Sequence, residues 1–198
     1  MKQYTILVDM DETLENLGVV WVDELNRRHG TSVIYDEITE WDMTKFFPSL
    51  SRNEVFAPLH DESIWKRVEP LPGAQDAVKA MKEDGHDVVV VTASHPDTVK
   101  WKYDWLDRYF PSITYRDIIF ASRKQLVKGD FLIDDAPHNL FGGQYTPIMF
   151  SAPHNRAWMP TTSAELNYFK VSSWPSATRL IRSFAEIPNL ETYLWTKA

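Results

Sequence analysis

Two aspartates, Asp9 and Asp11, stand one residue apart at the end of an apolar run near the start of the chain. Residues 4–8 are typical of a short buried strand, and Glu12 adds a third carboxylate within four residues. Carboxylates crowded at a strand end repel one another, so the fold gains nothing from them unless a cation lies there. The spacing therefore favours a metal-binding or catalytic role for Asp9 and Asp11.

Other reactive side chains also follow predicted strands. Asp134 and Asp135 end the apolar run 131–133, Thr92 and Ala93 follow the β-branched run 88–91, and Lys124 comes shortly after residues 118–120. In an open α/β sheet, ligands bind beyond the carboxyl ends of the strands. We therefore expect these side chains to gather at one edge of a parallel sheet.

The combination indicates phosphoryl transfer. Carboxylate oxygens are preferred ligands of Mg²⁺, and a hydroxyl with a lysine suits the oxygens of a phosphoryl group. A carboxylate held against the phosphorus can act as nucleophile, which gives an aspartyl-phosphate intermediate. Asp9 is the expected nucleophile, and Asp11 is expected to protonate the leaving oxygen and then deprotonate the attacking water.

Helical and strand patterns alternate along most of the chain. The spacing predicts helices over residues 14–28 (ended by Gly30), 73–84, 97–109 (with Asp97 as a cap) and 176–185, and strands over 4–8, 88–91, 118–120, 131–133, 147–150 and 169–171. This alternation predicts an α/β fold, a parallel Rossmann-like sheet with helices on both faces. Residues 1–14 and 69–198 would form this core domain. The irregular, aromatic-rich segment 15–68 would be a small helical cap inserted after the first strand.

The composition limits the classes of partner. The 198 residues, 43% hydrophobic and 25% charged, fit one core domain with an insertion. The formal charge of −7 argues against polymeric nucleic acid as a partner, but it allows a small phosphorylated substrate. No apolar run approaches the roughly 20 residues of a membrane span, and the chain has no cysteine. We expect a cytoplasmic protein that does not bind a membrane; a homodimer is compatible with the sequence.

The order of these motifs resembles the haloacid dehalogenase superfamily of phosphatases. More narrowly, Asp9-Met10-Asp11, the stretch Glu-Pro-Leu-Pro-Gly-Ala at 69–74, Lys-Tyr-x-Trp at 102–105 and Leu-Ile-Asp-Asp at 132–135 resemble the 5′(3′)-deoxyribonucleotidases. The resemblance covers about residues 4 to 155. It implies a Mg²⁺-dependent 5′-nucleotidase that dephosphorylates (deoxy)nucleoside monophosphates.

The resemblance also implies roles for individual residues. Asp9, the backbone carbonyl of Asp11 and one of the two late aspartates would hold Mg²⁺, with Asp135 favoured as the direct ligand and Asp134 beside it. Thr92, Ala93 and Lys124 lie where the family binds phosphate, and Lys124 is preferred to Lys128 because it lies ten residues before Asp134. Trp41 and Trp65 would face the nucleobase, or alternatively form the core of the cap.

Some positions depart from the family pattern. Glu12-Thr13 stands where the family usually has Gly-Val, Leu17 replaces a base-stacking Phe, and Ala93 replaces a hydroxyl residue. Lys100 and Lys102 are expected to be solvated on their helix, although the resemblance allows Lys102 to reach the substrate. The six histidines show no zinc spacing, and only His95, beside the Thr-Ala-Ser loop, attracts notice.

Three alternatives remain open at this point. The same chemistry could act on another small phosphate ester. A phospho-accepting receiver-type signalling domain also combines carboxylates, a hydroxyl and a lysine on a parallel sheet, although its acidic pair lies on the first strand. A relative that only binds nucleotide is the third alternative, and measurable turnover would exclude it.

Overall fold

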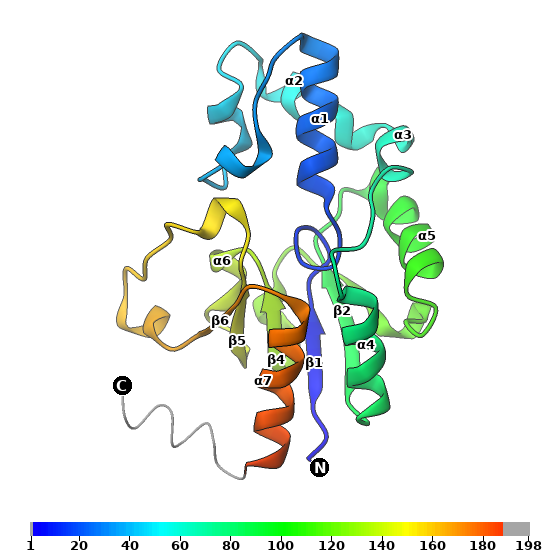
Figure 1. Cartoon of the computed structure of the whole chain (residues 1–198), viewed down its shortest axis with the longest axis vertical. Coiled ribbons are helices and arrows are strands. Elements are labelled where there is room, and N and C mark those ends of the chain that lie inside the picture. The colour runs from blue at the N-terminus through cyan, green and yellow to red at the C-terminus, as the bar shows by residue number, and fades with distance from the viewer. Residues whose placement is uncertain (1, 188–198) are drawn as a thin grey trace.

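The computed structural model describes residues 2–187. Six parallel strands form one sheet in the order β3-β2-β1-β4-β5-β6 (Figure 1). The strands are β1 (Thr5–Val8), β2 (Asp87–Thr92), β3 (Ile118–Phe120), β4 (Lys128–Asp134), β5 (Gln144–Phe150) and β6 (Phe169–Val171). The chain adds strands to one side of β1 up to β3 and then to the other side from β4 onward. The topological switch point, where such sheets bind ligands, therefore lies between β1 and β4.

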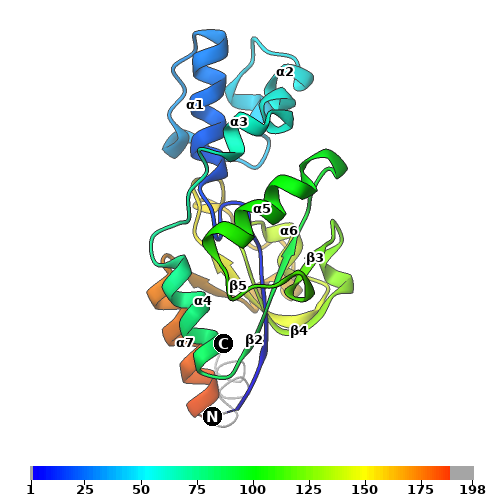
Figure 2. The ribbon, with the colours of Figure 1, turned by 90° about the vertical axis from the view of Figure 1, so that its right-hand side faces the viewer.

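Helices cover both faces of the sheet, as predicted. Helices α4 (Ala74–Glu83), α5 (Val99–Tyr109) and α7 (Trp174–Glu186) pack on the face that carries Ile6 and Val8, and the short helix α6 (Pro137–Leu140) packs on the face that carries Leu7. Figure 2 shows α4 and α7 side by side on one face. Alternate residues of β1 are buried on opposite faces because successive strand side chains point in opposite directions.

A mainly helical layer lies beyond the carboxyl ends of the strands (Figures 1 and 2). It contains α1 (Leu17–His29), α2 (Arg52–Phe56), α3 (Glu62–Trp65) and the 3₁₀ turns Tyr35–Glu37, Met43–Phe46 and Ala57–His60. We call this layer, residues 17–65, the cap. Some of its buried side chains form a cluster separate from that of the sheet, namely Val22, Leu25, Ile38, Met43, Phe47 and Val55. Others, namely Leu17, Val20, Ile64 and Trp65, belong to the core that the sheet forms. The predicted domain boundaries at 14/15 and 68/69 stay a prediction, and residues 188–198 of the second segment lie outside the described residues.

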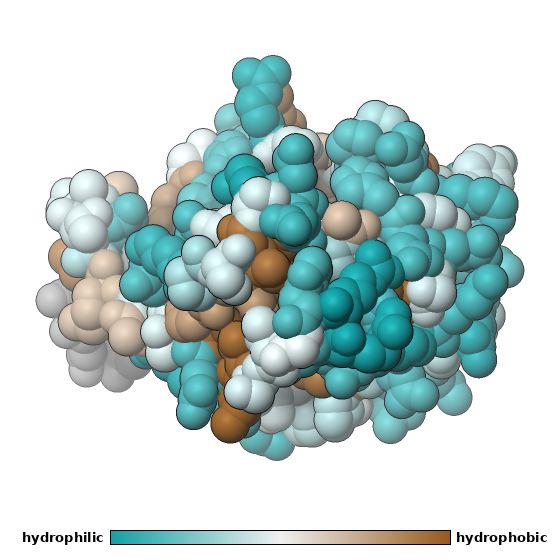
Figure 3. All heavy atoms as spheres, turned by 90° about the horizontal axis from the view of Figure 1, so that it is seen from above, coloured by the Kyte–Doolittle hydropathy of each residue, from teal (hydrophilic) through white to brown (hydrophobic). Residues whose placement is uncertain are grey.

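A buried carboxylate links the elements of the cap. Glu24 of α1 accepts hydrogen bonds from Arg27 and Arg28 one turn later and from Arg67 beyond α3. The side chain of Glu24 is buried, whereas the three arginines reach solvent. Seen from the cap end, the surface is largely hydrophilic, with hydrophobic atoms gathered in a narrow central band (Figure 3).

Several element boundaries differ from the predictions. The first helix begins at Leu17 rather than Leu14, because the backbone N–H groups of Leu14 and Glu15 donate to the carbonyl of Met10 in a tight turn. It ends at Gly30, as predicted, where a left-handed φ of 66° closes the last turn. Asp97 does not cap the helix over 97–109, since a 3₁₀ turn precedes α5 and His95 accepts from the Asp97 N–H.

The final helix contacts the loop that follows β1. Trp174, at the start of α7, is fully buried and donates from its indole nitrogen to the carbonyl of Thr13 at 2.9 Å. Its ring also packs against Phe150 of β5 at 5.3 Å between centroids. The two contacts fix the loop after β1 against α7 and β5. No helix among residues 2–187 is long and apolar enough to cross a membrane.

Candidate active site

Asp9 directly follows β1 and lies at the switch point, buried with only 6% of its surface exposed. Its carboxylate forms an ion pair with Lys124, whose side chain is 1% exposed and also contacts Asp134 Oδ2 at 2.7 Å. Burial alone lowers the pKa of Lys124, but the charges of Asp9 and Asp134 outweigh it and raise that pKa above its ordinary value. Lys124 is therefore a permanently charged ammonium between two carboxylates, whereas Lys128 is exposed.

Asp134 ends β4 and Asp135 follows it, and the two carboxylates lie in different surroundings. Asp134 is saturated, since it accepts from Lys124, from the Ala136 N–H at 2.8 Å and from the Asn139 amide at 3.2 Å. Asp135 is also buried, but its Oδ2 has no hydrogen-bond partner. The two carboxylates are therefore not equivalent, as the sequence predicts.

The three aspartates fit a divalent cation. Asp9, Asp134 and Asp135 each offer a buried carboxylate oxygen, and these oxygens lie within 4.8 Å of one another. Burial raises the pKa of Asp9 well above its ordinary value, and although Lys124 opposes this, Asp134 and Asp135 add to it. One ammonium cannot compensate three buried carboxylates. A bound hard cation, which prefers oxygen ligands, would compensate this excess of negative charge. It would also coordinate Asp135 Oδ2, which has no hydrogen-bond partner.

Asp11 lies across from this cluster and pairs with Lys102 of α5. Lys102 donates to Asp11 Oδ2 at 2.7 Å, to Thr92 Oγ1 at 2.8 Å and to the Ala93 carbonyl at 2.8 Å. Burial raises the pKa of Asp11, but the ammonium of Lys102 opposes it, and that pKa lies below its ordinary value. The expectation that Lys102 is solvated is wrong, because only 2% of its surface is exposed. Thr92 is fully buried and Ala93 is exposed.

Glu12 adopts a backbone conformation that normally favours glycine. Its φ is 55°, the only positive value outside glycine among the described residues. The Glu12 carboxylate accepts a hydrogen bond from the Gly18 N–H at the start of α1. A Cβ added at Gly18 would lie 2.5 Å from the ring of Tyr35 and 2.9 Å from Glu12 Oε1. Gly18 is therefore required by close approach, and Glu12 ties the loop after β1 to the cap.

The sequence did not predict two further ionisable residues at this site. Glu15 is fully buried beside Asp11, and burial followed by the charge of Asp11 raises the pKa of Glu15 well above its ordinary value. His154 Nε2 lies 3.0 Å from Asp135 Oδ2, although neither atom has a hydrogen-bond partner. The only sequence signal for Glu15 is its nearness to Asp11, and His154 has none.

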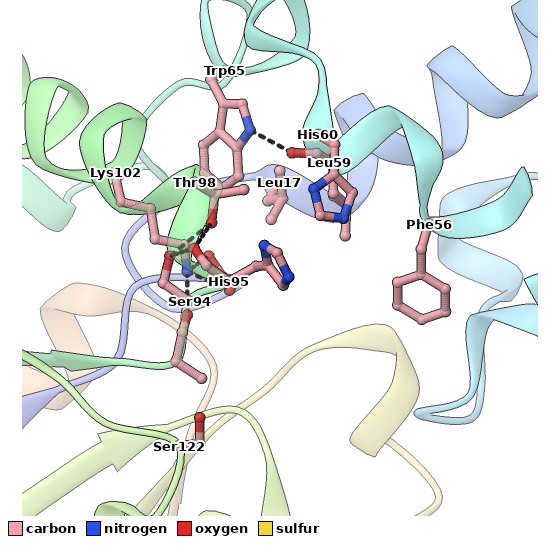
Figure 4. Close-up of a pocket in the computed structure, with 12 residues that line it drawn as sticks. Leu17, Phe56, Leu59, His60, Trp65, Ser94, His95, Thr98, Lys102 and Ser122 are labelled. Atoms are coloured by element: carbon pink, nitrogen blue, oxygen red, sulfur yellow. Dashed lines mark hydrogen bonds and ion pairs between the residues drawn. The ribbon is translucent and has the colours of Figure 1, made fainter. Parts of the chain in front are cut away.

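Cavities open between this cluster and the cap. One of about 400 Å³ is lined by Asp11, Leu17, Leu59, Trp65 and Lys102 among others. Figure 4 shows Trp65, Leu59 and Leu17 near Lys102. A second one of about 180 Å³ shares Asp11 and Leu17 and reaches Trp41.

The two predicted aromatic residues differ in burial. Trp65 is 6% exposed and belongs to the hydrophobic core, where it donates to the Leu59 carbonyl at 3.0 Å. Trp41 is 59% exposed, and its ring contacts His138 and His154 edge-on. Trp65 therefore combines a core role with a place in the cavity wall, whereas Trp41 is free to contact a ligand.

The parallel sheet, the Asp-x-Asp loop, the late aspartate pair and the helical cap define the class of haloacid dehalogenase-like hydrolases. Solved structures share this fold. A predicted phosphatase from Clostridium acetobutylicum matches with a TM-score of 0.63 at 14% identity, over 92% of this chain and all of the other. A HAD-type hydrolase from Bacillus subtilis, solved with bound magnesium, matches with a TM-score of 0.58 at 14% identity, over 91% of this chain and 99% of the other.

Sequence comparison narrows the class to one family. The family model described as 5′ nucleotidase, deoxy (pyrimidine), cytosolic type C protein matches residues 3–185. The 5′(3′)-deoxyribonucleotidase of Bacillus subtilis (strain 168) is 31% identical over 175 residues, which is 88% of this chain and 96% of the relative. The chain belongs to this family of deoxyribonucleotidase-like phosphatases. The predicted resemblance, the α/β fold and the assignment as a phosphomonoester hydrolase are thereby confirmed.

Proposed function

We propose that this chain is a magnesium-dependent 5′-nucleotidase that hydrolyses (deoxy)nucleoside monophosphates through an aspartyl-phosphate on Asp9. The observation that carries the proposal is the buried cluster of Asp9, Lys124, Asp134 and Asp135 at the switch point of the sheet. Family membership supports the substrate class, since the relatives are named 5′(3′)-deoxyribonucleotidases.

Asp9, Asp135 and the backbone carbonyl of Asp11 would hold Mg²⁺, with Asp134 beside them. When bound, the cation neutralises charge on the phosphoryl oxygens and on these carboxylates. Lys124 holds the carboxylate of Asp9 in place and offers its ammonium to a phosphate oxygen. Asp134, bound on every side, holds Lys124 in turn.

In the first step, a carboxylate oxygen of Asp9 bonds to phosphorus while the bond from phosphorus to the ester oxygen breaks. Asp11 gives its proton to that leaving oxygen, which departs as the nucleoside hydroxyl. In the second step, Asp11 takes a proton from water as the water oxygen bonds to phosphorus. Asp9 is released, and inorganic phosphate forms.

Lys102 supplies a way to change the protonation state of Asp11. With Lys102 on its carboxylate, Asp11 is held ionised, which suits the second step but not the first. An oxygen of an incoming phosphate would compete with Asp11 for the ammonium of Lys102. The Thr92 hydroxyl, which already contacts this ammonium, would bind the phosphate as well. When Lys102 moves to phosphate, Asp11 loses its counterion and its pKa rises, which favours the acid form. Substrate binding by Lys102 and Thr92 would thus prepare Asp11 to donate a proton.

The cavity supports a nucleoside as the leaving group. Its volume of about 400 Å³ falls within the roughly 300–1,000 Å³ of ligand pockets, and its far wall is apolar. Trp65 and Trp41 would face the base from the two sides of Leu17. Leu17 is a smaller aliphatic side chain where the family has a Phe ring that stacks on the base. The base would therefore contact the ring of Trp41 or Trp65 rather than Leu17.

The test is phosphate release, with and without Mg²⁺, from a panel of deoxy- and ribonucleoside monophosphates and simple phosphate esters. We expect Mg²⁺-dependent, multi-turnover release that favours deoxynucleotides, and none from Asp9→Asn. Release without nucleotide preference would retain Asp9 and Asp11 but refute the nucleotide assignment. Release that stops at one equivalent would instead support a phospho-accepting domain. The predicted cytoplasmic location and homodimer stay predictions.

A further inference from the structure

Two histidines and an aspartate meet where the cap faces the core, outside the buried aspartate cluster. His60 ends the 3₁₀ turn Ala57–His60 of the cap, whereas His95 and Asp97 lie in the loop after β2. The two imidazole rings meet edge to face, with centroids 4.8 Å apart and planes at 80°. Figure 4 shows both rings at the cavity, His60 approaching from the cap and His95 from the core.

The spacing of the ligand atoms matches a tetrahedral metal ion. Asp97 Oδ2 lies 3.2 Å from His95 Nδ1 and 3.7 Å from His60 Nδ1, and the three side chains offer ligand atoms within 4.8 Å of one another. Zn²⁺ binds His and Asp at about 2.0–2.1 Å, so tetrahedral ligand atoms stand about 3.4 Å apart. The two Nδ1–Oδ2 distances lie on either side of this value.

We propose that His60, His95 and Asp97 form a second metal site that takes a transition-metal dication such as Zn²⁺ and clasps the cap to the core. Imidazole ligands suit Zn²⁺, Ni²⁺ or Cu²⁺, whereas Mg²⁺ prefers the all-oxygen cluster around Asp9. Two His and one Asp leave a fourth position for water. The site differs from the aspartate cluster in its residues, its ligand chemistry and its exposure to solvent.

The surroundings make the site accessible. The side chains of His60, His95 and Asp97 are 44%, 58% and 66% exposed, so an ion can enter without unfolding the loop. Within residues 2–187, His95 Nδ1 gives up one hydrogen bond, a long one accepted from the Asp97 N–H at 3.4 Å. The carboxylate of Asp97 already faces both rings, so binding requires only small rotations of the side chains.

A bound ion would act as a crosslink between the cap and the core. One ligand belongs to the cap and two to the core loop that follows Thr92, so separating the layers would break a metal–ligand bond. The ion would also narrow the cavity that His60 and His95 line. A transition-metal ion bound by His60, His95 and Asp97 would therefore slow the entry and exit of substrate and product at the proposed Mg²⁺ site.

Zinc binding is measured directly, by calorimetric titration in saturating Mg²⁺ without substrate. We expect one Zn²⁺ per chain, at least tenfold weaker binding in His60→Ala and in His95→Ala, and unchanged binding in His29→Ala. His29 is the matched control, an exposed histidine at the end of α1. Replacing Zn²⁺ by Co²⁺ should give visible absorption typical of tetrahedral coordination, lost in the first two variants.

Two results would overturn the proposal. Zinc binding that survives in both His60→Ala and His95→Ala would place the ion elsewhere. Binding that disappears in Asp135→Asn, while that variant stays folded, would place it in the aspartate cluster. Because no turnover is measured, the outcome is independent of the nucleotidase proposal. Circular dichroism of each variant checks that the exposed substitutions leave the fold intact.

Discussion

Replacing Lys124 by Met removes the one ammonium between Asp9 and Asp134 while keeping the length of the side chain. Breaking a buried ion pair by deleting one partner costs about 3–5 kcal/mol, because the remaining charge is left uncompensated. Lys124 is 1% exposed and contacts both carboxylates, so we expect Lys124→Met to lose about this much of its free energy of unfolding at pH 7 without divalent cations. Lys128→Met is the control, since Lys128 is exposed and its replacement should change stability by less than about 0.5 kcal/mol.

The loss should depend on pH and on Mg²⁺. Without Lys124, the pKa of Asp9 rises further, so the folded variant binds more protons than the unfolded chain. Stability then falls as pH rises, and the loss is larger at pH 7.5 than at pH 5. Mg²⁺ at about 100 times its dissociation constant for the variant would stabilise the folded variant by about 2.7 kcal/mol. Urea unfolding of both variants and of the unmodified chain measures these differences, and a Lys124→Met protein within 1 kcal/mol of the unmodified one at pH 7.5 would refute the charge assignment.

Three further predictions test the acid/base residue, the cavity wall and the cap. Asp11→Asn should lower kcat by about 10²-fold or more, and an unchanged rate would remove Asp11 from proton transfer. Trp41→Ala should raise KM by about 5- to 150-fold, the equivalent of about 1–3 kcal/mol of base stacking, with little change in stability because Trp41 is exposed. Hydrogen bonds from Arg27 and Arg28, opposed by burial, lower the pKa of Glu24 from 4.5 to about 2. The ionised Glu24 therefore stabilises the folded chain above about pH 4.5, and this stabilisation is lost as pH falls toward 2. Because the arginines reach solvent, we discount this to about 1–3 kcal/mol, which Glu24→Gln should lose in urea unfolding at pH 7; an equally large loss at pH 3 would contradict the reasoning.

The sheet and its aspartates could be predicted because both depend on local pattern. Apolar runs fix the strands, and parallel strands bring their carboxyl ends together, so Asp9 and Asp135 meet although they are far apart in the chain. The burial of Lys102 could not be predicted in this way. It depends on contacts with Asp11, Thr92 and Ala93, which belong to other segments of the chain, so the pattern of α5 alone does not show it. His60 and His95 show no metal-ligand spacing because they approach from different layers.

The hydrogen bond between Trp174 and Thr13 joins residues 161 positions apart. The ribosome therefore makes the Asp9–Asp11 loop well before it makes the tryptophan that fixes this loop. A chain made only as far as β6 would carry Asp9 and Asp11 but lack the indole that supports the loop after β1. Such long-range pairing is slow to form, so competence for catalysis should arise only after α7 has left the ribosome and docked.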